Sequence, residues 1–469
     1  MRHRHAQDQA IAPRSRQGHH PRCRRSHQRL RRPVPDGQPV QTPLDGLTVR
    51  GHLSQSDRAR AARHLARIIG RGDSLDHVVR RETNPLCLEM TYGCLRHYFS
   101  LAEAVEGRLA RPLRAKDLDV LCLLLVGAYQ LQRMRVPGHA AINETVSAVR
   151  ALGKPWAAAL VNAVLRKLPT RPDDDASEHP PWLQGKIEAQ YGDQAPALLR
   201  ANNQRAPMGL RVNCRKIEPR AYRTLLDDAG IAFDDAWLPE SILLRKPQPS
   251  ATLPGFRDGL VAVQDVGAQL VGGFMRERLQ GGCRVLDACA APGGKLFHLL
   301  ESGLKLDLTA LDNAPARLQT LTEMAKRLGH EGFATTAADA CGLDWWDGEP
   351  FDCVLVDAPC SGSGTLRRHP DIKVNRTPKQ VRQASQLQGA LLRNLWRTVR
   401  PGCTLLYCTC SILAEENDQV VESFLEAQAD ARAVGVELPT GTATRHGWQM
   451  LPTEPATDGF YLARIDRQP

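Results

Sequence analysis

From about residue 260 onward, short apolar segments alternate with longer amphipathic ones, and this alternation constrains the fold more than any other feature of the chain. The expected strands are 284–288, 306–311, 353–356 and 404–407, and the expected helices are 274–279, 314–328 and 380–399. Strands that alternate with helices in this way predict a parallel sheet with helices on both faces. We therefore predict a doubly wound α/β domain over residues 256–469, with ligands bound beyond the carboxyl ends of its strands.

Two smaller units precede this domain. Residues 51–170 place apolar residues at helical spacing, most clearly over 59–69 and 118–134, and therefore predict an all-α domain. Residues 171–255 begin with a linker rich in Pro and Asp, which is followed by the pattern of a helix over 182–203, a short strand and an amphipathic helix. This second segment predicts a small α+β subdomain.

The first 50 residues differ in composition from the rest of the chain. Residues 1–32 hold ten Arg and a single acid, Asp8, so most of the formal net charge of +11 lies in this segment. It lacks a periodic apolar pattern, which predicts disorder. Three explanations stay open: a basic arm that binds phosphates, a solvated tail, or an extension from a wrongly chosen start codon. Any nucleic-acid site in the folded part must come from local clusters.

Several classes of protein do not fit the composition. The longest apolar run, near residues 120–126, is far shorter than a membrane span, and no segment has the order of a secretory signal. We therefore expect a cytoplasmic monomer with no membrane partner. The thirteen Cys show no pair of C-x₂-C motifs, so no metal centre is expected, and a disulfide framework does not fit a chain without an export signal.

The first chemical motif is VLDACAAPGGK, residues 285–295, in which a strand leads through small residues into a helix. Small residues allow a ligand to approach the backbone, and the helix start offers free N–H groups. The spacing is not G-x-G-x-x-G, so the dinucleotide fingerprint is not met. Asp312 ends the next expected strand and could accept ribose hydroxyls, and Asp339 follows one more strand, expected before residue 339, and could reach an adenine edge. The alternative is a plain glycine-rich turn with capping acids.

Two further motifs place thiols at strand ends. FDCVLVDAPCSGSGT, residues 351–365, ends its strand at Asp357 and opens the next loop with Pro359 and Cys360. TLLYCTCS, residues 404–411, places Cys410 just past another strand. Either cysteine alone is more typical of a buried structural thiol. Two thiols at one sheet edge, beside a nucleoside site, indicate a shared chemical role.

A thiol pair beside a nucleoside site suits covalent catalysis on a pyrimidine. C5 of cytosine is a poor nucleophile, but addition of a thiolate to C6 makes C5 enamine-like and able to attack a methyl sulfonium. A proton on N3 would stabilise this adduct, and Asp357 is a suitable acid for that position. The second thiol could assist release of the product. The residues alone do not decide which of the two cysteines is the nucleophile.

A basic cluster follows the Cys360 loop. Arg367, Arg368, His369 and Lys373 could hold phosphates around an extruded nucleotide, although a solvated charged loop is the plainer explanation. C6 of a base is shielded within a stack, so the target must be single-stranded or flipped. Aromatic residues make up only 5% of the chain, so no large stacking platform is expected.

Taken together, these motifs resemble those of the RsmB/Sun (Fmu) family of bacterial 16S rRNA cytosine-5 methyltransferases. The resemblance includes ANNQRAPM, residues 201–208, Gln264-Asp265 and RRHPDIK, residues 367–373, and it covers about residues 53–466. It implies that residues 256–469 form a Rossmann-like methyltransferase domain that uses S-adenosyl-L-methionine. It also implies a NusB-like RNA-binding domain at the N-terminal side, an RNA-recognition-type subdomain between the two, and 16S rRNA in a partly assembled small subunit as the substrate.

The resemblance also implies roles for individual residues. Cys410 is the implied nucleophile and Cys360 the implied residue for product release, while Lys295 is implied to orient Asp357 by an ion pair. The implied contacts of S-adenosyl-L-methionine are Cys289, Ala290, Ala291, Pro292, Gly293, Gly294, Lys295, Asp312, Asp339 and Asp357.

The sequence departs from the family pattern at a few positions. Leu296, Val374 and Gly267 stand where the family often has other residues, and none of them is a thiol or a cofactor acid. Two other functions stay open. A tRNA or DNA cytosine methyltransferase would use the same chemistry, but it fits the NusB-like segment less well. A non-catalytic RNA-binding assembly factor would not need both thiols.

Overall fold

The computed structural model describes residues 56–171, 177–453 and 457–469. The Arg-rich segment 1–50, for which we predict disorder, therefore lies outside the described residues. The whole described part belongs to one compact unit, Leu53–Pro469. None of the described helices combines the length and the apolar composition that a membrane-crossing segment needs.

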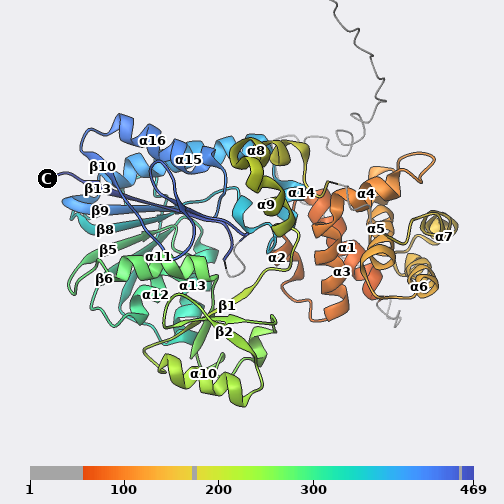
Figure 1. Cartoon of the computed structure of the whole chain (residues 1–469), viewed down its shortest axis with the longest axis horizontal. Coiled ribbons are helices and arrows are strands. Elements are labelled where there is room, and N and C mark those ends of the chain that lie inside the picture. Colours follow the sequence, from red (N-terminus) through yellow and green to blue (C-terminus); the bar gives the residue numbers. More distant parts are fainter. Residues whose placement is uncertain (1–55, 172–176, 454–456) are drawn as a thin grey trace, which may run out of the picture. The chain divides into compact units, whose positions relative to one another are not determined.

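The N-terminal domain is helical (Figure 1). Its main helices are α1 (Asp57–Arg71), α3 (Pro85–Arg96), α4 (Tyr98–Glu106), α5 (Leu118–Arg133), α6 (Gly138–Ala151) and α7 (Ala158–Arg166). Every residue of α5 from Val120 to Gln130 is buried, because α1, α3, α4, α6 and α7 all pack against it. The helix predicted over 118–134 is confirmed, and it takes the centre of the bundle because it is apolar on all sides.

The small subdomain contains more strands than its sequence predicts. Its antiparallel sheet has the order β2-β3-β1-β4, formed by Phe233–Asp235, Ser241–Leu244, Met208–Val212 and Val261–Val263, and α10 (Pro219–Asp228) packs against it. The expected single helix over 182–203 is wrong. It is two helices, α8 (Pro181–Tyr191) and α9 (Ala195–Ala201), because Gly192 takes a positive φ of 48° that interrupts the first.

The C-terminal domain is built on a mixed sheet. Five parallel strands run in the order β7-β6-β5-β8-β9, formed by Phe333–Ala337, Asp307–Asp312, Arg284–Ala288, Phe351–Asp357 and Val399–Thr409. The expected parallel strands are confirmed, but the sheet continues past β9 with the antiparallel strand β13 (Phe460–Arg467). The shorter strands β10 (Ala431–Val434), β11 (Thr442–Ala443) and β12 (Trp448–Met450) complete this edge.

Helices cover both faces of this sheet (Figure 1). On one face lie α11 (Val266–Arg276), α12 (Gly294–Glu301) and α13 (Pro315–Leu328), and on the other lie α15 (Pro378–Trp396) and α16 (Asp418–Ala427). The bounds expected for the helix over 274–279 are wrong, because α11 begins earlier, at Val266. The side chain of Asp265 caps this start by accepting a hydrogen bond from Gly267 N. The strand order reverses between β5 and β8, which opens a crevice at their carboxyl ends.

Candidate active site

The turn between β5 and α12 has an unusual backbone. Cys289 has a φ of 65° and Gly293 a φ of 100°, and the bond between Ala291 and Pro292 is cis. A Cβ on Gly293 would lie 2.3 Å from the Phe297 ring, so only glycine fits there. The backbone of this turn therefore lies at the crevice, and its small side chains leave the crevice open. Residues 289–295 were expected to let a ligand approach the backbone in this way.

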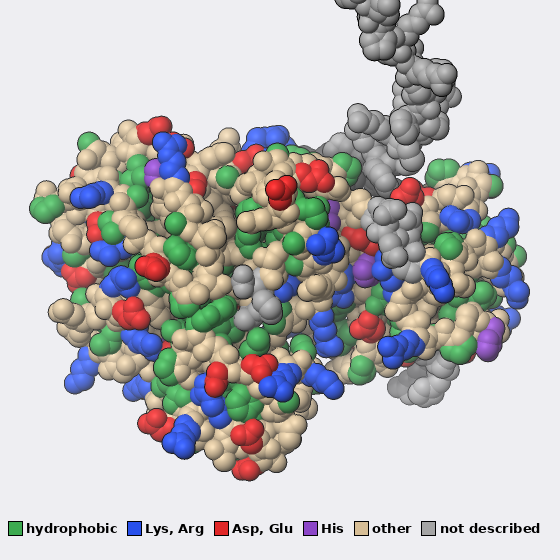
Figure 2. All heavy atoms as spheres, in the orientation of Figure 1, with side chains coloured by type: hydrophobic (Ala, Val, Ile, Leu, Met, Phe, Trp, Pro, Cys, Tyr) green, Lys and Arg blue, Asp and Glu red, His purple; other side chains and the backbone are tan. Residues whose placement is uncertain are grey.

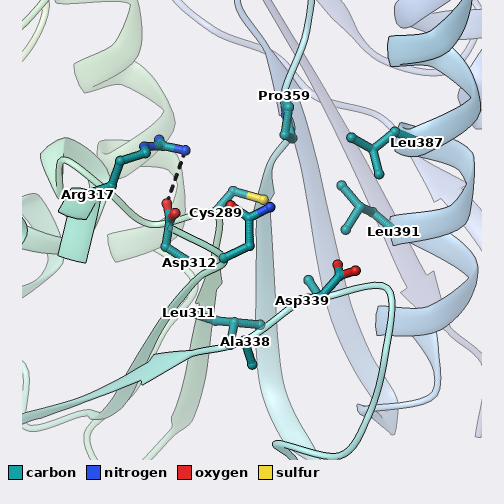
Figure 3. Close-up of a pocket in the computed structure, with 11 residues that line it drawn as sticks. Cys289, Leu311, Asp312, Arg317, Ala338, Asp339, Pro359, Leu387 and Leu391 are labelled. Carbon is teal, nitrogen blue, oxygen red and sulfur yellow. Dashed lines mark ion pairs between the residues drawn. The ribbon is translucent and has the colours of Figure 1, made fainter. Parts of the chain in front are cut away.

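Acidic side chains stand at the ends of β6 and β7 (Figure 3). Asp312, at the end of β6, is buried, accepts a hydrogen bond from Ala314 N at 3.0 Å and pairs with Arg317 at 3.2 Å. Asp339, beyond β7, is exposed and accepts one from Cys341 N. Both line a groove whose opposite wall is formed by Pro359, Leu387 and Leu391. Acceptors on one wall and aliphatic side chains on the other can hold a ribose and a purine.

Lys295 and Asp357 form an ion pair at the end of β8. Lys295 Nζ lies 2.5 Å from Asp357 Oδ2, and the Cys408 thiol donates to Asp357 Oδ1 at 3.5 Å. Burial would lower the pKa of the Lys295 ammonium, but Asp357 and Cys408 raise it more, so this group keeps its proton. The pair places one fixed carboxylate at the sheet edge, between the nucleoside groove and the thiols.

The two predicted thiols lie in contact. Cys360 Sγ and Cys410 Sγ are 3.2 Å apart, although the residues are 50 positions apart in sequence, and both residues are partly exposed. The hydrogen bond between them lowers the pKa of Cys410 below its ordinary value, against the opposing effect of burial. The same bond, together with burial, raises the pKa of Cys360. This contact allows one sulfur to ionise while the other keeps its proton, and the family resemblance implies Cys410 for the first role.

A buried acid that the sequence did not reveal holds the loops that contain Cys360 and Cys410, here called the thiol loops. Glu416 accepts hydrogen bonds from the Ser361 backbone and hydroxyl at 2.6 and 2.5 Å, and from Ser411 Oγ at 2.6 Å. Ser361 follows Cys360 and Ser411 follows Cys410, so one fully buried carboxylate ties the backbone beside each sulfur. No sequence signal points to it, because its partners come from two separate loops.

Asp287, within the first motif, was also missed as a functional candidate. It is 1% exposed, and neither of its carboxylate oxygens has a hydrogen-bond partner among the described residues. Burial, followed by the charge of Asp357, raises its pKa to about 8. At neutral pH this carboxyl is therefore largely protonated, which keeps Lys295 paired with Asp357 as its charged partner.

The basic cluster after Cys360 is mostly inside the protein. Arg367 is 3% exposed and bonded to Asp458 at 2.7 Å, and Lys373 is fully buried, with Nζ donating to Arg96 O and to Asn203 Oδ1. The prediction that these two residues hold phosphates does not fit this structure, because their charged groups are bonded internally.

The other two members of that cluster are less deeply buried. Arg368 pairs with Asp458 and Asp265, and His369 pairs with Asp76 at 3.4 Å. Phosphate binding by these two side chains stays a prediction.

One group of potential metal ligands occurs in the described residues, far from the expected chemistry. His64, Glu82 and Cys87 each offer a ligand atom within 4.8 Å of the others. Burial and the neighbouring Glu82 raise the pKa of Cys87 to about 12, so its thiol stays protonated.

Comparison with known proteins gives a consistent result over three parts of the chain. The family model "16S rRNA methyltransferase RsmB/F" matches residues 278–466. A ferredoxin-like domain model of the same methyltransferases matches residues 179–251, and the NusB family model matches residues 55–169. The three matches fall on the mixed sheet, the small antiparallel sheet and the helical domain.

Similar proteins span nearly the same length. The probable ribosomal RNA small subunit methyltransferase B of Coxiella burnetii is 39% identical over 83% of this chain and 94% of its own. Ribosomal RNA small subunit methyltransferase B of Pseudomonas putida is 40% identical over 87% of this chain and 98% of its own. A solved structure described as PH0851 shares the fold, with a TM-score of 0.76 at 23% identity, over 88% of this chain and 100% of that one.

Proposed function

Because this chain belongs to the RsmB/F family of 16S rRNA methyltransferases, we propose that it methylates C5 of a cytosine in that RNA through a covalent bond to Cys410. The proposed methyl donor is S-adenosyl-L-methionine. The observation that carries this proposal is the contact between two thiols at the ends of neighbouring strands, beside a groove suited to a nucleoside.

The reaction follows from the order in which protons and electron pairs move. The Cys410 thiolate adds to C6, the C5–C6 π electrons become available at C5, and Asp357 stabilises a proton at N3. C5 would then take the methyl carbon from the sulfonium, whose S–CH3 bond would break and leave its electron pair on the sulfur as a neutral thioether. Loss of the C5 proton to solvent restores the C5–C6 double bond and expels the thiolate of Cys410, and N3 returns its proton to solvent as the neutral base re-forms. Cys360, whose pKa is raised, stays protonated beside the departing sulfur and stabilises it by a hydrogen bond.

The residues of the crevice fit the proposed methyl donor. Asp312 can accept both ribose hydroxyls, and Leu391 with Pro359 can flank an adenine ring, while the backbone of the β5–α12 turn is open to the methionine part. When bound, the donor supplies an electrophilic methyl group on a sulfonium. The surrounding carboxylates, with Asp357 nearest to the thiols, match its positive charge.

Removing the two thiols one at a time should have opposite effects, and these effects distinguish the roles of Cys360 and Cys410. Cys360→Ala should leave the nucleophile in place but slow its release, so a protein–RNA species that survives denaturant should accumulate with 16S rRNA and S-adenosyl-L-methionine. Cys410→Ala should form no such species. A denaturing gel with labelled RNA measures both, and Cys214→Ser, at an exposed cysteine, is the control. If the two variants behaved in the reverse way, the roles would be exchanged.

The substrate class needs a separate measurement. Methyl transfer from a radiolabelled donor should occur with 16S rRNA and not with tRNA or duplex DNA of equal concentration. Bisulfite sequencing of the RNA would then locate the modified cytosine. Methylation that appears at a nitrogen or a ribose hydroxyl would contradict the proposed chemistry while leaving family membership intact. The cytoplasmic location and the monomeric state stay predictions.

A further inference from the structure

An exposed tryptophan stands on the helical N-terminal domain, away from the residues of the thiol site. Trp156 has 55% of its surface exposed, the largest fraction among the exposed large hydrophobic residues of the described chain. It lies in the short 3₁₀ turn Pro155–Ala157 between α6 and α7. A tryptophan in that position contributes little to the core and presents its ring to the surroundings.

The ring borders a groove of about 420 Å³. One wall is the loop between α4 and α5, which contributes Arg111, Arg114 and Lys116, all of them exposed, and the floor contains Leu109 and Leu160. On the face drawn in Figure 2, Lys and Arg side chains gather over the helical domain at the right, where Figure 1 places α4 to α7.

The two walls of the groove are joined by the polar contacts of Lys154. Lys154, two residues before Trp156, donates to Lys116 O at 2.6 Å and pairs with Asp117 at 3.0 Å and Asp119 at 2.7 Å. Asp117 is the only acid that lines the groove within the described residues, and Lys154 already balances its charge. The three exposed cations therefore have no partner among the ion pairs of the described chain, and the groove carries a net positive charge.

We infer that this groove, bounded by Trp156 and three cations, binds a single-stranded segment of the substrate RNA. An aromatic face stacks on a base of any sequence, and flanking cations contact its phosphates. A membrane surface would need a broader apolar area, and an acidic peptide would use the cations but not a lone ring. The inference rests on an rRNA substrate and not on the cysteine chemistry.

Photocrosslinking gives the most direct test. The full-length protein is mixed with a 12-nucleotide single-stranded RNA that carries 5-iodouridine, irradiated, digested and analysed by mass spectrometry. A crosslink is expected on the peptide that contains Trp156, and it should also form with the Cys410→Ala variant. Crosslinks that map only to other parts of the chain would overturn the inference.

Binding by variants supplies the second test, with fluorescence anisotropy of the same RNA without iodine. Trp156→Ala should weaken binding about tenfold and Trp156→Phe by less than about threefold, because a phenyl ring still stacks. Changing Arg111, Arg114 and Lys116 together to Gln should lower the slope of log affinity against log salt by about 2. Circular dichroism checks that each variant is folded.

A matched control uses three exposed cations on other parts of the chain. Lys305, Lys326 and Arg432, changed together to Gln, remove the same charge and should leave affinity within about twofold. Equal losses in both triple variants would show only a general charge effect and overturn the inference. The same follows if a polyglutamate peptide competes as well as RNA does, because the groove would then be an acidic-peptide site.

Discussion

Two neighbouring stretches of the catalytic domain use their reactive side chains in opposite ways. The thiol loops leave Cys360 and Cys410 partly exposed, with the two sulfurs in contact, whereas the basic segment 367–373 directs its charged groups inward. The buried carboxylate of Glu416 holds the backbone beside each cysteine. Neither sulfur is therefore needed to hold its loop, and both stay available for reaction. Proximity to an active site therefore does not make a charged residue a ligand contact, and burial decides which groups can react.

The largest expected effect separates the nucleophile from all other residues of the site. Cys410→Ser should reduce methylation of 16S rRNA by about 10⁴-fold or more, since a hydroxyl cannot replace the thiolate at neutral pH. The melting temperature should change little. Methyl transfer from a radiolabelled donor measures this, with Cys214→Ser as the control. Activity within tenfold of the unmodified protein would remove Cys410 from the reaction.

Loss of the buried partners of the basic segment 367–373 should lower the stability of the folded protein. Asp458→Ala leaves buried Arg367 and half-buried Arg368 without their shared carboxylate, and should cost about 3–5 kcal/mol of unfolding free energy. Thermal unfolding should show a melting temperature lower by on the order of 10 °C. Asp344→Ala, at an exposed acid, is the matched control. Equal melting temperatures would show that the segment is not the scaffold described.

Lys373 should make stability depend on pH. Burial lowers its pKa from 10.5 to about 7 in the folded protein. From about pH 7 to pH 10 the unfolded chain holds a proton that the folded chain has lost, so stability rises with pH by up to about 1.4 kcal/mol per unit. Lys373→Met should flatten this rise in urea unfolding, while Lys379→Met, at an exposed lysine, should not. Identical slopes for both variants would contradict the account.

The smallest effect is expected at the outer end of the same segment. His369→Gln should change affinity for a 16S rRNA fragment by no more than about twofold, because a side chain already paired with Asp76 can add only a weak phosphate contact. The change is best measured by anisotropy beside Trp156→Ala, for which about a tenfold loss is expected. A loss at His369 that exceeds the one at Trp156 would place the main RNA contact near the thiols.

The sequence predicted the parts of this protein whose signals are local. The strand β5 has the predicted bounds Arg284–Ala288, and the motifs at the ends of β8 and β9 led to the thiol contact because parallel strands end at one edge. The antiparallel edge was not predicted, since β12 has only three residues and pairs with a strand whose position the local pattern does not reveal.

Burial of the basic segment could not be predicted for a related reason. Arg367 bonds to Asp458, 91 residues away, and Lys373 bonds to Asn203 and Arg96, 170 and 277 residues away. A run of cations looks solvated until such distant partners are known. Glu416 could not be identified from the sequence for the same reason, because its partners Ser361 and Ser411 come together only when the sheet has formed.

The most direct test of the central proposal uses the intact protein and RNA in which the target cytosine is replaced by 5-fluorocytosine. Fluorine at C5 cannot leave as a proton does, so the adduct should persist with all thiols present. After nuclease and protease digestion, mass spectrometry should find the methylated, fluorinated nucleotide on Cys410. The same nucleotide on Cys360 or Cys408, or no adduct under conditions that methylate normal RNA, would contradict the account.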